Sequence, residues 1–390
     1  MSDPGRWLLV CLGAAALVQI AHWIGRALRP SPLRRDTGRS VGWESLMHGR
    51  RFFRLNHPLH ADSPQGWPIR IELTLEGEEL RLRLQIGPVP GIPERLSLSP
   101  SRVGYSGPSK AAHFIHTAHA DLDRAAVIQG EVAPALALFD AMPSPEALAQ
   151  AVREHGLTVR DQIVELIVPS RAGGAGDREA IRHAVALAEG LVLNPQELPS
   201  RVARCAATNP NRWQRLACLA WLAERAQTLL AAPEVRDGIE RAACHEDPAT
   251  RVEAAALLGA EGLETLRRVV ADPKVPVPVG LRALGLLDPA LSPSELVACV
   301  LPRFAGTAWE PARSPAAPVK TGPERSVPPP AGALRSLLGS GDPVAAMAAV
   351  SVFRRADCPD LEPAVIGVLW RDEEALLTAA IQALAERGSG

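Results

Sequence analysis

Three histidines at a spacing of three residues form the one cluster in the sequence whose residue types bind metals. They are His113, His116 and His119, and Asp121 and Asp123 follow them. Zinc is held by three or four imidazole, thiolate or carboxylate ligands that converge on one point. Three residues along a helix turn the side chain by about 60°, and along a strand successive positions alternate between faces. Neither geometry brings all three rings together, so surface or turn histidines are favoured, and a metal-dependent enzyme centred on this cluster is the alternative.

The two aspartates offer a second kind of chemistry, general acid–base catalysis by paired carboxylates. Asp121 and Asp123 lie in a turn-like run, where aspartate usually accepts hydrogen bonds from its own backbone. The sequence holds no phosphate-binding glycine loop, no G-x-S-x-G and no H-E-x-x-H. Arg267 and Arg268 are interpreted as solvated surface and not as a phosphate clamp. The sequence therefore predicts no catalytic residue, no metal and no cofactor.

The stretch 247–273 indicates the architecture of the C-terminal half. Asp247 followed by Pro248 is typical of a helix start, because aspartate caps the first-turn amides and proline needs no N–H there. Apolar residues at helical spacing follow, and a glycine turn that begins at Gly259 precedes a second apolar stripe. Asp272, again before a proline, opens another unit. Similar starts recur at Asn209, Asp342 and Asp372.

This repeat has a recognisable pattern, D-P-x-x-R-x-x-A-A-x-x-L-G. It is carried by Asp247, Pro248, Arg251, Ala254, Ala255, Leu258 and Gly259. The pattern resembles HEAT-like (armadillo-type) helical repeats, over roughly residues 199–301 and 331–387. A single helix pair cannot bury its apolar face alone, so stacked pairs are expected to share one core. The resemblance implies a scaffold that binds other proteins, without assigning a binding role to any individual residue.

The longest apolar run, residues 7–24, predicts a transmembrane anchor. Eighteen helical residues rise about 27 Å, close to the ~30 Å hydrocarbon core of a bilayer. Trp7 and Trp23 lie at its two ends, and five arginines between residues 26 and 39 follow it. The positive-inside rule then places the C-terminal bulk in the cytoplasm, as a single-pass protein. A cleavable signal peptide and a buried helix are the alternatives, and the basic residues 25–42 are either a lipid-facing segment or a solvated linker.

Residues 43–169 are predicted to form a small α+β domain. Residues 69–75 and 80–86 alternate apolar and polar side chains on either side of Gly77, which indicates an antiparallel hairpin with one buried face. Further strands are predicted near residues 95–98, 113–117, 125–129 and 159–168, and helices over 134–139 and 144–154. A short tail, residues 1–6, precedes the anchor. Helical repeats are predicted over 170–301 and 331–390, separated by a proline-rich linker over 302–330.

Composition excludes some classes of function. Apolar residues make up 47% of the chain and aromatic residues only 4%, which favours packed helices over a large aromatic-rich sandwich. The net charge is −1, and residues 201–300 hold 12 basic and 12 acidic side chains, so the electrostatic footprint of a nucleic-acid-binding surface is missing. Six widely spaced cysteines without a C-x-x-C pair indicate buried thiols in a reducing compartment.

Together these features predict an α+β N-terminal domain followed by a HEAT-like α-helical repeat domain, with a single N-terminal transmembrane helix. The predicted function is that of a membrane-anchored cytoplasmic scaffold whose helical surface binds a partner protein. Membrane contact is expected through the N-terminal helix and the basic segment, and nucleic-acid binding is not expected. A metal-dependent enzyme and a nucleic-acid-binding HEAT-like protein are the alternatives.

Overall fold

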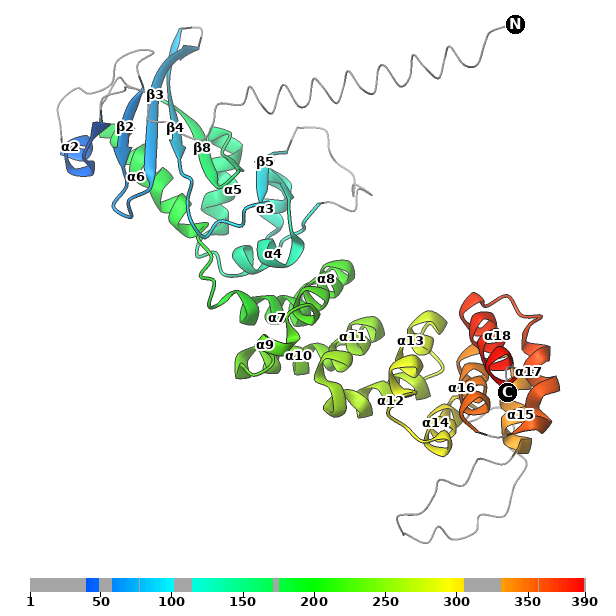
Figure 1. Cartoon of the computed structure of the whole chain (residues 1–390). Helices are drawn as coiled ribbons and strands as arrows, with labels where there is room; N and C mark the ends of the chain where they lie inside the picture. The colour runs from blue at the N-terminus through cyan, green and yellow to red at the C-terminus, as the bar shows by residue number, and fades with distance from the viewer. Residues whose placement is uncertain are drawn as a thin grey trace, which may run out of the picture. The chain divides into compact units, whose positions relative to one another are not determined.

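The computed structural model describes residues 40–48, 58–76, 78–101, 114–170, 175–304, 331–356 and 358–388 (Figure 1). The chain divides into two compact units. The sheet unit holds the described residues up to Ile115, together with His119–Glu131 and Met142–Leu193. The helical unit holds His116–Ala118, Val132–Ala141 and the described residues from Asn194 onward. Each unit is described here by itself.

The sheet unit is built on one sheet, which has eight strands in the described residues, in the order β1-β2-β3-β4-β8-β7-β5-β6. β1 and β2 run parallel, and the other neighbours are antiparallel. The strands are β1 (Ser40–Val41), β2 (Leu59–Asp62), β3 (Pro68–Glu76), β4 (Glu79–Ile86), β5 (Ser97–Pro100), β6 (Ala126–Gln129), β7 (Thr158–Arg160) and β8 (Ile163–Pro169). The hairpin predicted from the period-two pattern is present as β3 and β4, with Ile69 opposite Ile86 and Glu76 opposite Glu79.

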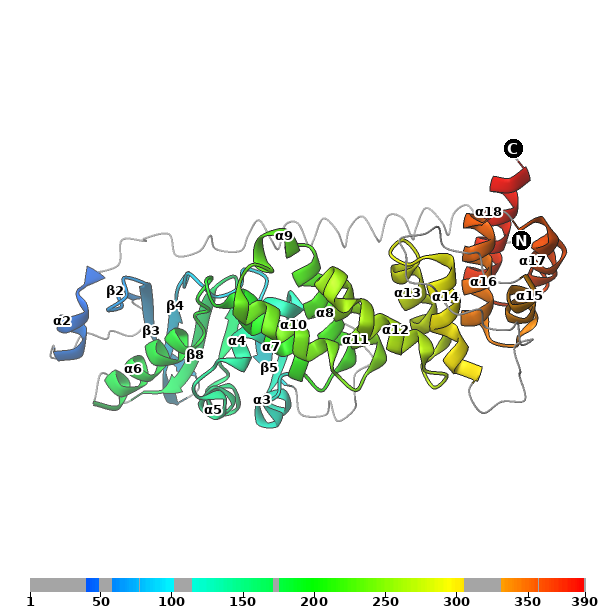
Figure 2. The ribbon, with the colours of Figure 1, turned by 90° about the horizontal axis from the view of Figure 1, so that it is seen from below.

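Period-two alternation gives the sheet an apolar face and a polar face. Ile69, Ile71 and Leu73 on β3 are buried, whereas Arg70 and Glu72 between them are half-exposed. Helices α5 (Pro145–His155) and α6 (Ala175–Gly190) pack on β4, β5 and β8. Both lie along the same side of the strands in Figure 2. The unit also contains α2 (Trp43–His48), which packs on β2, and α3 (Ala120–Ala125).

The helical unit is a stack of paired helices. Within it α8, α11, α13, α16 and α18 pack successively, each on the next. Its elements are α4 (Val132–Asp140), α7 (Leu198–Thr208), α8 (Arg212–Ala223), α9 (Ala226–Leu229), α10 (Pro233–Ala243), α11 (Pro248–Leu258), η1 (Gly259–Gly262), α12 (Leu263–Ala271), α13 (Val277–Leu287), α14 (Pro293–Val300), η2 (Leu301–Phe304), α15 (Ala331–Gly339), α16 (Pro343–Arg355), η3 (Pro359–Leu361), α17 (Glu362–Val368) and α18 (Glu374–Gly388). The helix-rich C-terminal half is compatible with a helical-repeat fold.

One core joins the helices on both sides of residues 305–330, which lie outside the described residues. A continuous cluster of buried side chains runs from Ala249 in α11 to Ala383 in α18, and it includes Leu296 of α14 and Val350 of α16. α16 packs on α13 and α14 as well as on α15 and α18. The C-terminal helices therefore continue the stack.

Helix starts are set by local capping, as the sequence predicted at two positions. The side chains of Asp247 and Asp342 accept hydrogen bonds from the first-turn amides of α11 and α16, and a proline follows each of them. The start predicted at Asp272 is wrong, because that residue ends α12 and its carboxylate accepts the Lys274 N–H at 2.9 Å. The next helix, α13, begins only at Val277.

α4 is a helix of the helical unit although the sequence on both sides of it belongs to the sheet unit. Every residue from Ala133 to Phe139 is buried, and the helix packs on α7 and α8. A short helix that is apolar on all sides needs neighbours on all sides. α4 therefore extends the apolar core of α7 and α8.

A buried guanidinium, that of Arg215, joins the N-terminal ends of α8 and α11, which pack on each other. Arg215 donates to the carbonyls of Asn209 at 2.8 Å and Pro210 at 3.1 Å, just before α8. It also donates to Thr250 Oγ1 at 3.1 Å and to Asp247 Oδ2 at 3.3 Å, at the start of α11. Only 6% of the Arg215 side chain is exposed. The charge is thus fully paired in the interior, as a buried guanidinium requires.

The same device recurs further along the stack. Arg303 in η2 donates to the carbonyls of Val270 at 3.0 Å and Asp272 at 2.8 Å, and it pairs with Asp342 at the start of α16. Its side chain is 3% exposed. Two buried arginines therefore bind the C-terminal end of one helix, α7 or α12, to the N-cap aspartate of a later helix, α11 or α16.

Two titratable groups at the start of α11 have lowered pKa values. Burial works to raise the pKa of Asp247, but hydrogen bonds from Thr250 and Arg215, with the nearby charge of Arg212, outweigh it and lower that pKa. Burial lowers the pKa of His245, and the charge of Arg215 adds to the effect. His245 Nδ1 accepts the Asp247 N–H at 2.9 Å, which is possible only while that nitrogen carries no proton.

Close helix contact requires glycine at one position of α10. A Cβ on Gly238 would lie 2.7 Å from the Cβ of Ala203 on α7 and 2.9 Å from its carbonyl carbon. Real side chains do not approach so closely. The α7–α10 contact therefore depends on the absence of a side chain at Gly238.

The predicted membrane topology is corrected by the structure. In the described part of the chain, no helix is both long and apolar enough to cross a bilayer. The longest of these, α6, has 16 residues, which rise about 24 Å, and it carries Asp177 and Arg182. The predicted anchor, residues 7–24, lies outside the described residues. The described residues therefore do not support a single-pass membrane protein, and the fold class they show is a largely antiparallel sheet unit and a helical unit.

Candidate functional site

The histidine cluster does not form a metal centre in the described residues. His113 lies outside them, His116 is exposed, and His119 is a half-buried residue directly before α3. No group of three or more His, Cys, Asp or Glu side chains in this part of the chain is placed to hold a metal ion. Asp121 pairs with Arg124 at 2.8 Å. Asp123 lies in the first turn of α3, where a carboxylate suits the positive helix end.

The polar face of the sheet unit carries a groove of about 510 Å³ over β4, β5, β7 and β8. Glu165 in this groove accepts hydrogen bonds from Arg83 Nε at 2.7 Å and Gln85 Nε2 at 3.0 Å. Its lining holds hydroxyl, amide and paired charged groups but no histidine, cysteine or lysine: Gln85, Ser97, Leu98, Ser99, Thr158, Val159, Arg160, Asp161, Ile163 and Glu165. The lining therefore contains no serine–histidine or cysteine–histidine pair for nucleophilic catalysis.

The tight turn between β7 and β8 borders this groove and is strained. Asp161 and Gln162 have φ angles of 51° and 63°, a left-handed conformation that hairpin turns usually assign to asparagine and glycine. Contacts with the loop between β4 and β5 hold the turn in place. Gln162 Nε2 donates to the Ile92 carbonyl at 2.8 Å, and the Gln162 carbonyl accepts the Val89 N–H at 2.9 Å.

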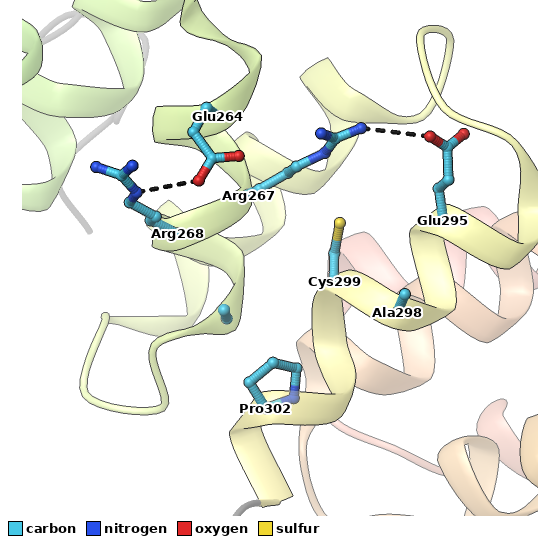
Figure 3. A pocket seen from close by; sticks show the side chains of 8 residues that line it. Glu264, Arg267, Arg268, Glu295, Ala298, Cys299 and Pro302 are labelled. Atoms are coloured by element: carbon cyan, nitrogen blue, oxygen red, sulfur yellow. Dashed lines mark hydrogen bonds and ion pairs between the residues drawn. The ribbon is translucent and has the colours of Figure 1, made fainter.

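A second groove, of about 440 Å³, lies between α12 and α14 of the helical unit (Figure 3). We call it the α12–α14 groove. Eight residues line it: Glu264, Arg267, Arg268, Ala271, Glu295, Ala298, Cys299 and Pro302. Seven of them come from α12 and α14, about 30 positions apart in the sequence, and Pro302 belongs to η2, which follows α14. The packing of α12 on α14 brings them together.

The charged residues of the α12–α14 groove form two ion pairs. Arg268 Nε lies 3.1 Å from Glu264 on the same helix, and Arg267 Nη2 reaches Glu295 on α14 at 3.4 Å. Figure 3 shows the second pair bridging the two helices. Hydrogen bonds from the hydroxyl and N–H of Ser292 lower the pKa of Glu295, so its carboxylate is charged at neutral pH. The two arginines predicted to be solvated are each paired with a carboxylate.

The groove also has small apolar residues beside these pairs. Ala298 is exposed, Ala271 is half-buried, and Cys299 is largely buried with its sulfur on the groove side (Figure 3). Burial raises the pKa of the Cys299 thiol, which keeps it protonated and a poor nucleophile. The arrangement therefore suits reversible binding of an apolar group and not covalent chemistry.

Sequence reasoning missed this groove because no local pattern encodes it. Glu264, Arg267 and Arg268 are ordinary surface residues of one amphipathic helix, and Glu295 belongs to the capping box of another. Their juxtaposition follows from tertiary packing alone. Comparisons with models of protein families, with curated proteins and with solved structures gave no match to this chain.

Proposed function

We propose that the chain is a protein-interaction module that binds a short segment of a partner protein in the α12–α14 groove. The observation that carries this proposal is the exposed groove itself, whose lining combines small apolar residues with two arginine–glutamate pairs. The resemblance of residues 247–259 to HEAT-like repeats adds support, because such repeats usually serve as scaffolds.

The size and polarity of the groove define what it would bind. A volume of about 440 Å³ lies at the lower end of the range for ligand pockets, enough for one or two large apolar side chains. Arg267 and Glu295 face each other across the opening, so a carboxylate or a cation of the partner can exchange into that pair. The proposed ligand is therefore a peptide with an apolar anchor next to a charged residue.

The other functions considered from the sequence have less support. A metal-dependent enzyme would need ligands that the described residues do not bring together. A nucleic-acid-binding surface would need an excess of free basic groups, whereas Arg267 and Arg268 in the groove are paired. The interaction module is therefore the function that we propose.

A substitution that fills the groove tests the proposal. Ala298→Trp places a large side chain in the opening without disturbing the core, because Ala298 is exposed on α14. Ala223→Trp, at an exposed alanine on α8, is the matched control. Random peptides displayed on phage are selected on the immobilised full chain, and the enriched sequences are synthesised with a fluorescent label for polarisation assays.

Enriched peptides should share an apolar anchor beside a charged residue. Their affinity should fall at least about tenfold in Ala298→Trp, or about 1.4 kcal/mol, and stay unchanged in Ala223→Trp. Failure to enrich any peptide, or equal binding by both variants, would refute the groove as the binding site. Circular dichroism of both variants confirms that they fold.

A further inference from the structure

Helices α17 and α18 and the turn between them expose large apolar side chains. Trp370 is 88% exposed, Ile381 58% and Ile366 43%. In the described part of the chain only three other large apolar residues are exposed: Leu75, Val192 and Trp213. Half of the exposed large apolar residues are thus concentrated between residues 362 and 388. Exposed tryptophan is a common anchor of protein interfaces.

Helical periodicity explains why these side chains remain outside the core. α18 directs Leu376, Ala380 and Ala383 into the shared core, and Ile381 lies on another face of the helix. In α17 the core positions are Val365 and Val368, with Ile366 on a different face. Apolar side chains off the core face of a packed helix normally give way to polar ones. Here Ile366 and Ile381 stand exposed on those other faces.

Acidic residues share the faces of these apolar side chains. Glu362 and Ile366 are four residues apart on α17, and Glu374 and Ile381 are seven apart on α18, so each pair lies on one face of its helix. Between Leu361 and Gly388 the chain has five carboxylates and two guanidinium groups, a formal charge of −3.

Both guanidinium groups of this segment have internal partners. Arg371 donates to the carbonyls of Leu338 and Ser340. Arg387 donates to the Ala356 carbonyl and lies over the Phe353 ring, 4.2 Å from its centre. The formal charge of −3 already counts both arginines, so the segment carries a net acidic charge. One carboxylate oxygen of Glu373, three residues after Trp370, is shielded from solvent and has no hydrogen-bond partner in the described residues.

We propose that this end face, defined by Ile366, Trp370 and Ile381 with Glu362 and Glu374, binds a basic amphipathic segment of a partner protein. Apolar side chains of that segment would cover the two isoleucines and the indole. Its lysine or arginine groups would pair with the carboxylates, and a cation over the face of Trp370 adds a further attraction. Charge complementarity selects this occupant, because a second copy of the chain would bring the same acidic residues against themselves.

The inference rests on the proposed function only in treating the helical unit as a binding surface. It concerns a different surface, and its test uses different residues. Ala298→Trp should leave binding at the end face unchanged, and substitution of Trp370 should leave peptide binding in the α12–α14 groove unchanged. The failure of one proposal is therefore distinguishable from the failure of the other.

The experiment uses the full chain and two fluorescein-labelled model peptides, an amphipathic helix of leucine and lysine and its counterpart of leucine and glutamate. The test variant is Trp370→Ser. The matched control is Trp213→Ser, because Trp213 is 75% exposed in the same unit but has the basic Arg212 guanidinium 5.8 Å from its ring centre. A third variant, Glu374→Lys, reverses one charge of the end face. Both tryptophans are largely exposed, so the substitutions should preserve folding, which circular dichroism checks.

The leucine–lysine peptide should bind, the leucine–glutamate peptide should not, and added salt should weaken binding because exposed charges are screened. Trp370→Ser should lower the affinity at least about tenfold, and Glu374→Lys should weaken it as well, whereas Trp213→Ser should have no effect. Equal binding of both peptides, or equal effects of the two tryptophan substitutions, would overturn the proposal. A dimer in sedimentation velocity that Trp370→Ser dissociates would also overturn it, since a second copy would then cover the end face.

Discussion

Removal of the Arg215 side chain is the sharpest test of how the helical stack is held together. Arg215→Ala deletes a guanidinium that makes four hydrogen bonds, to Asn209, Pro210, Thr250 and Asp247. Asp247 is left with its bonds from Thr250 and the more distant Arg212. Two carbonyls before α8 lose their side-chain donor at the same time.

The size of the effect follows from burial. Breaking a buried ion pair by removing one partner costs about 3–5 kcal/mol, because the remaining charge and polar groups stay desolvated without a partner. An exposed ion pair contributes at most about 1 kcal/mol. Arg215 is 6% exposed and Asp247 15%, whereas the pair of Arg241 and Asp237 on α10 is 55% and 67% exposed. Arg241→Ala is therefore the matched control, with an expected loss of about 0.5 kcal/mol.

Amide hydrogen exchange measured by mass spectrometry is the suitable assay. A chain with two units does not unfold in a single two-state step, so a local free energy of opening is more informative than one midpoint. A loss of about 3 kcal/mol should speed exchange in peptides covering residues 198–258 by about a hundredfold or more. Peptides from the sheet unit should be unaffected.

The reasoning would be refuted by a small or delocalised effect. If Arg215→Ala speeds exchange in residues 198–258 by less than about fivefold, or no more than Arg241→Ala does, the buried guanidinium does not hold α8 to α11. A double-mutant cycle with Asp247→Asn should then show no coupling, whereas residues of one hydrogen-bonded network usually couple by about 0.5–3 kcal/mol.

Three further predictions concern local geometry and pH. Gly238→Ala should destabilise the helical unit by about 1–3 kcal/mol, because its Cβ would overlap Ala203. Alanine stabilises most helix interiors, so the expected sign is unusual. Faster amide hydrogen exchange in α7 and α10 checks this prediction, and slower exchange would contradict it. Asp161→Gly should stabilise the sheet unit by about 0.5–1 kcal/mol through relief of the left-handed turn. Slower amide exchange in β7 and β8 checks this, and faster exchange there would refute it. Stability at α11 should fall as pH drops below about 6.5, where unfolded His245 gains a proton, and again near the lower folded pKa of Asp247. His245→Gln should remove the first decline, and an unchanged pH profile would refute its role.

Several elements could be predicted from the sequence because their determinants are local. The β3–β4 hairpin follows from the alternation of Ile69, Ile71 and Leu73 with charged residues, and the structure pairs the two strands antiparallel. Asp247 and Asp342 cap their helices because an aspartate side chain reaches amides only two or three residues away. The aspartate–proline signal failed at Asp272, where the carboxylate binds the Lys274 N–H in a turn. The same local chemistry serves a turn and a helix start.

The membrane prediction shows the limit of hydropathy. The run 7–24 has about the minimum length that spans a bilayer and includes Gln19 and His22. An apolar run of that length is consistent with an anchor, a signal peptide or a buried helix, because hydropathy measures the composition of a segment and not its surroundings. The described helices are shorter, and those of the stack bury their apolar faces against one another.

The sequence by itself determined the alternating hairpin, the helix starts at Asp247 and Asp342, and the overall balance of charge, since these depend on residues a few positions apart. Only the tertiary structure decided that α4 packs with α7 and α8, that Arg215 joins the N-terminal ends of α8 and α11, and that Arg267 pairs with Glu295 across a groove. These contacts join residues tens of positions apart. Their formation depends on how helices pack, which no short window of sequence encodes.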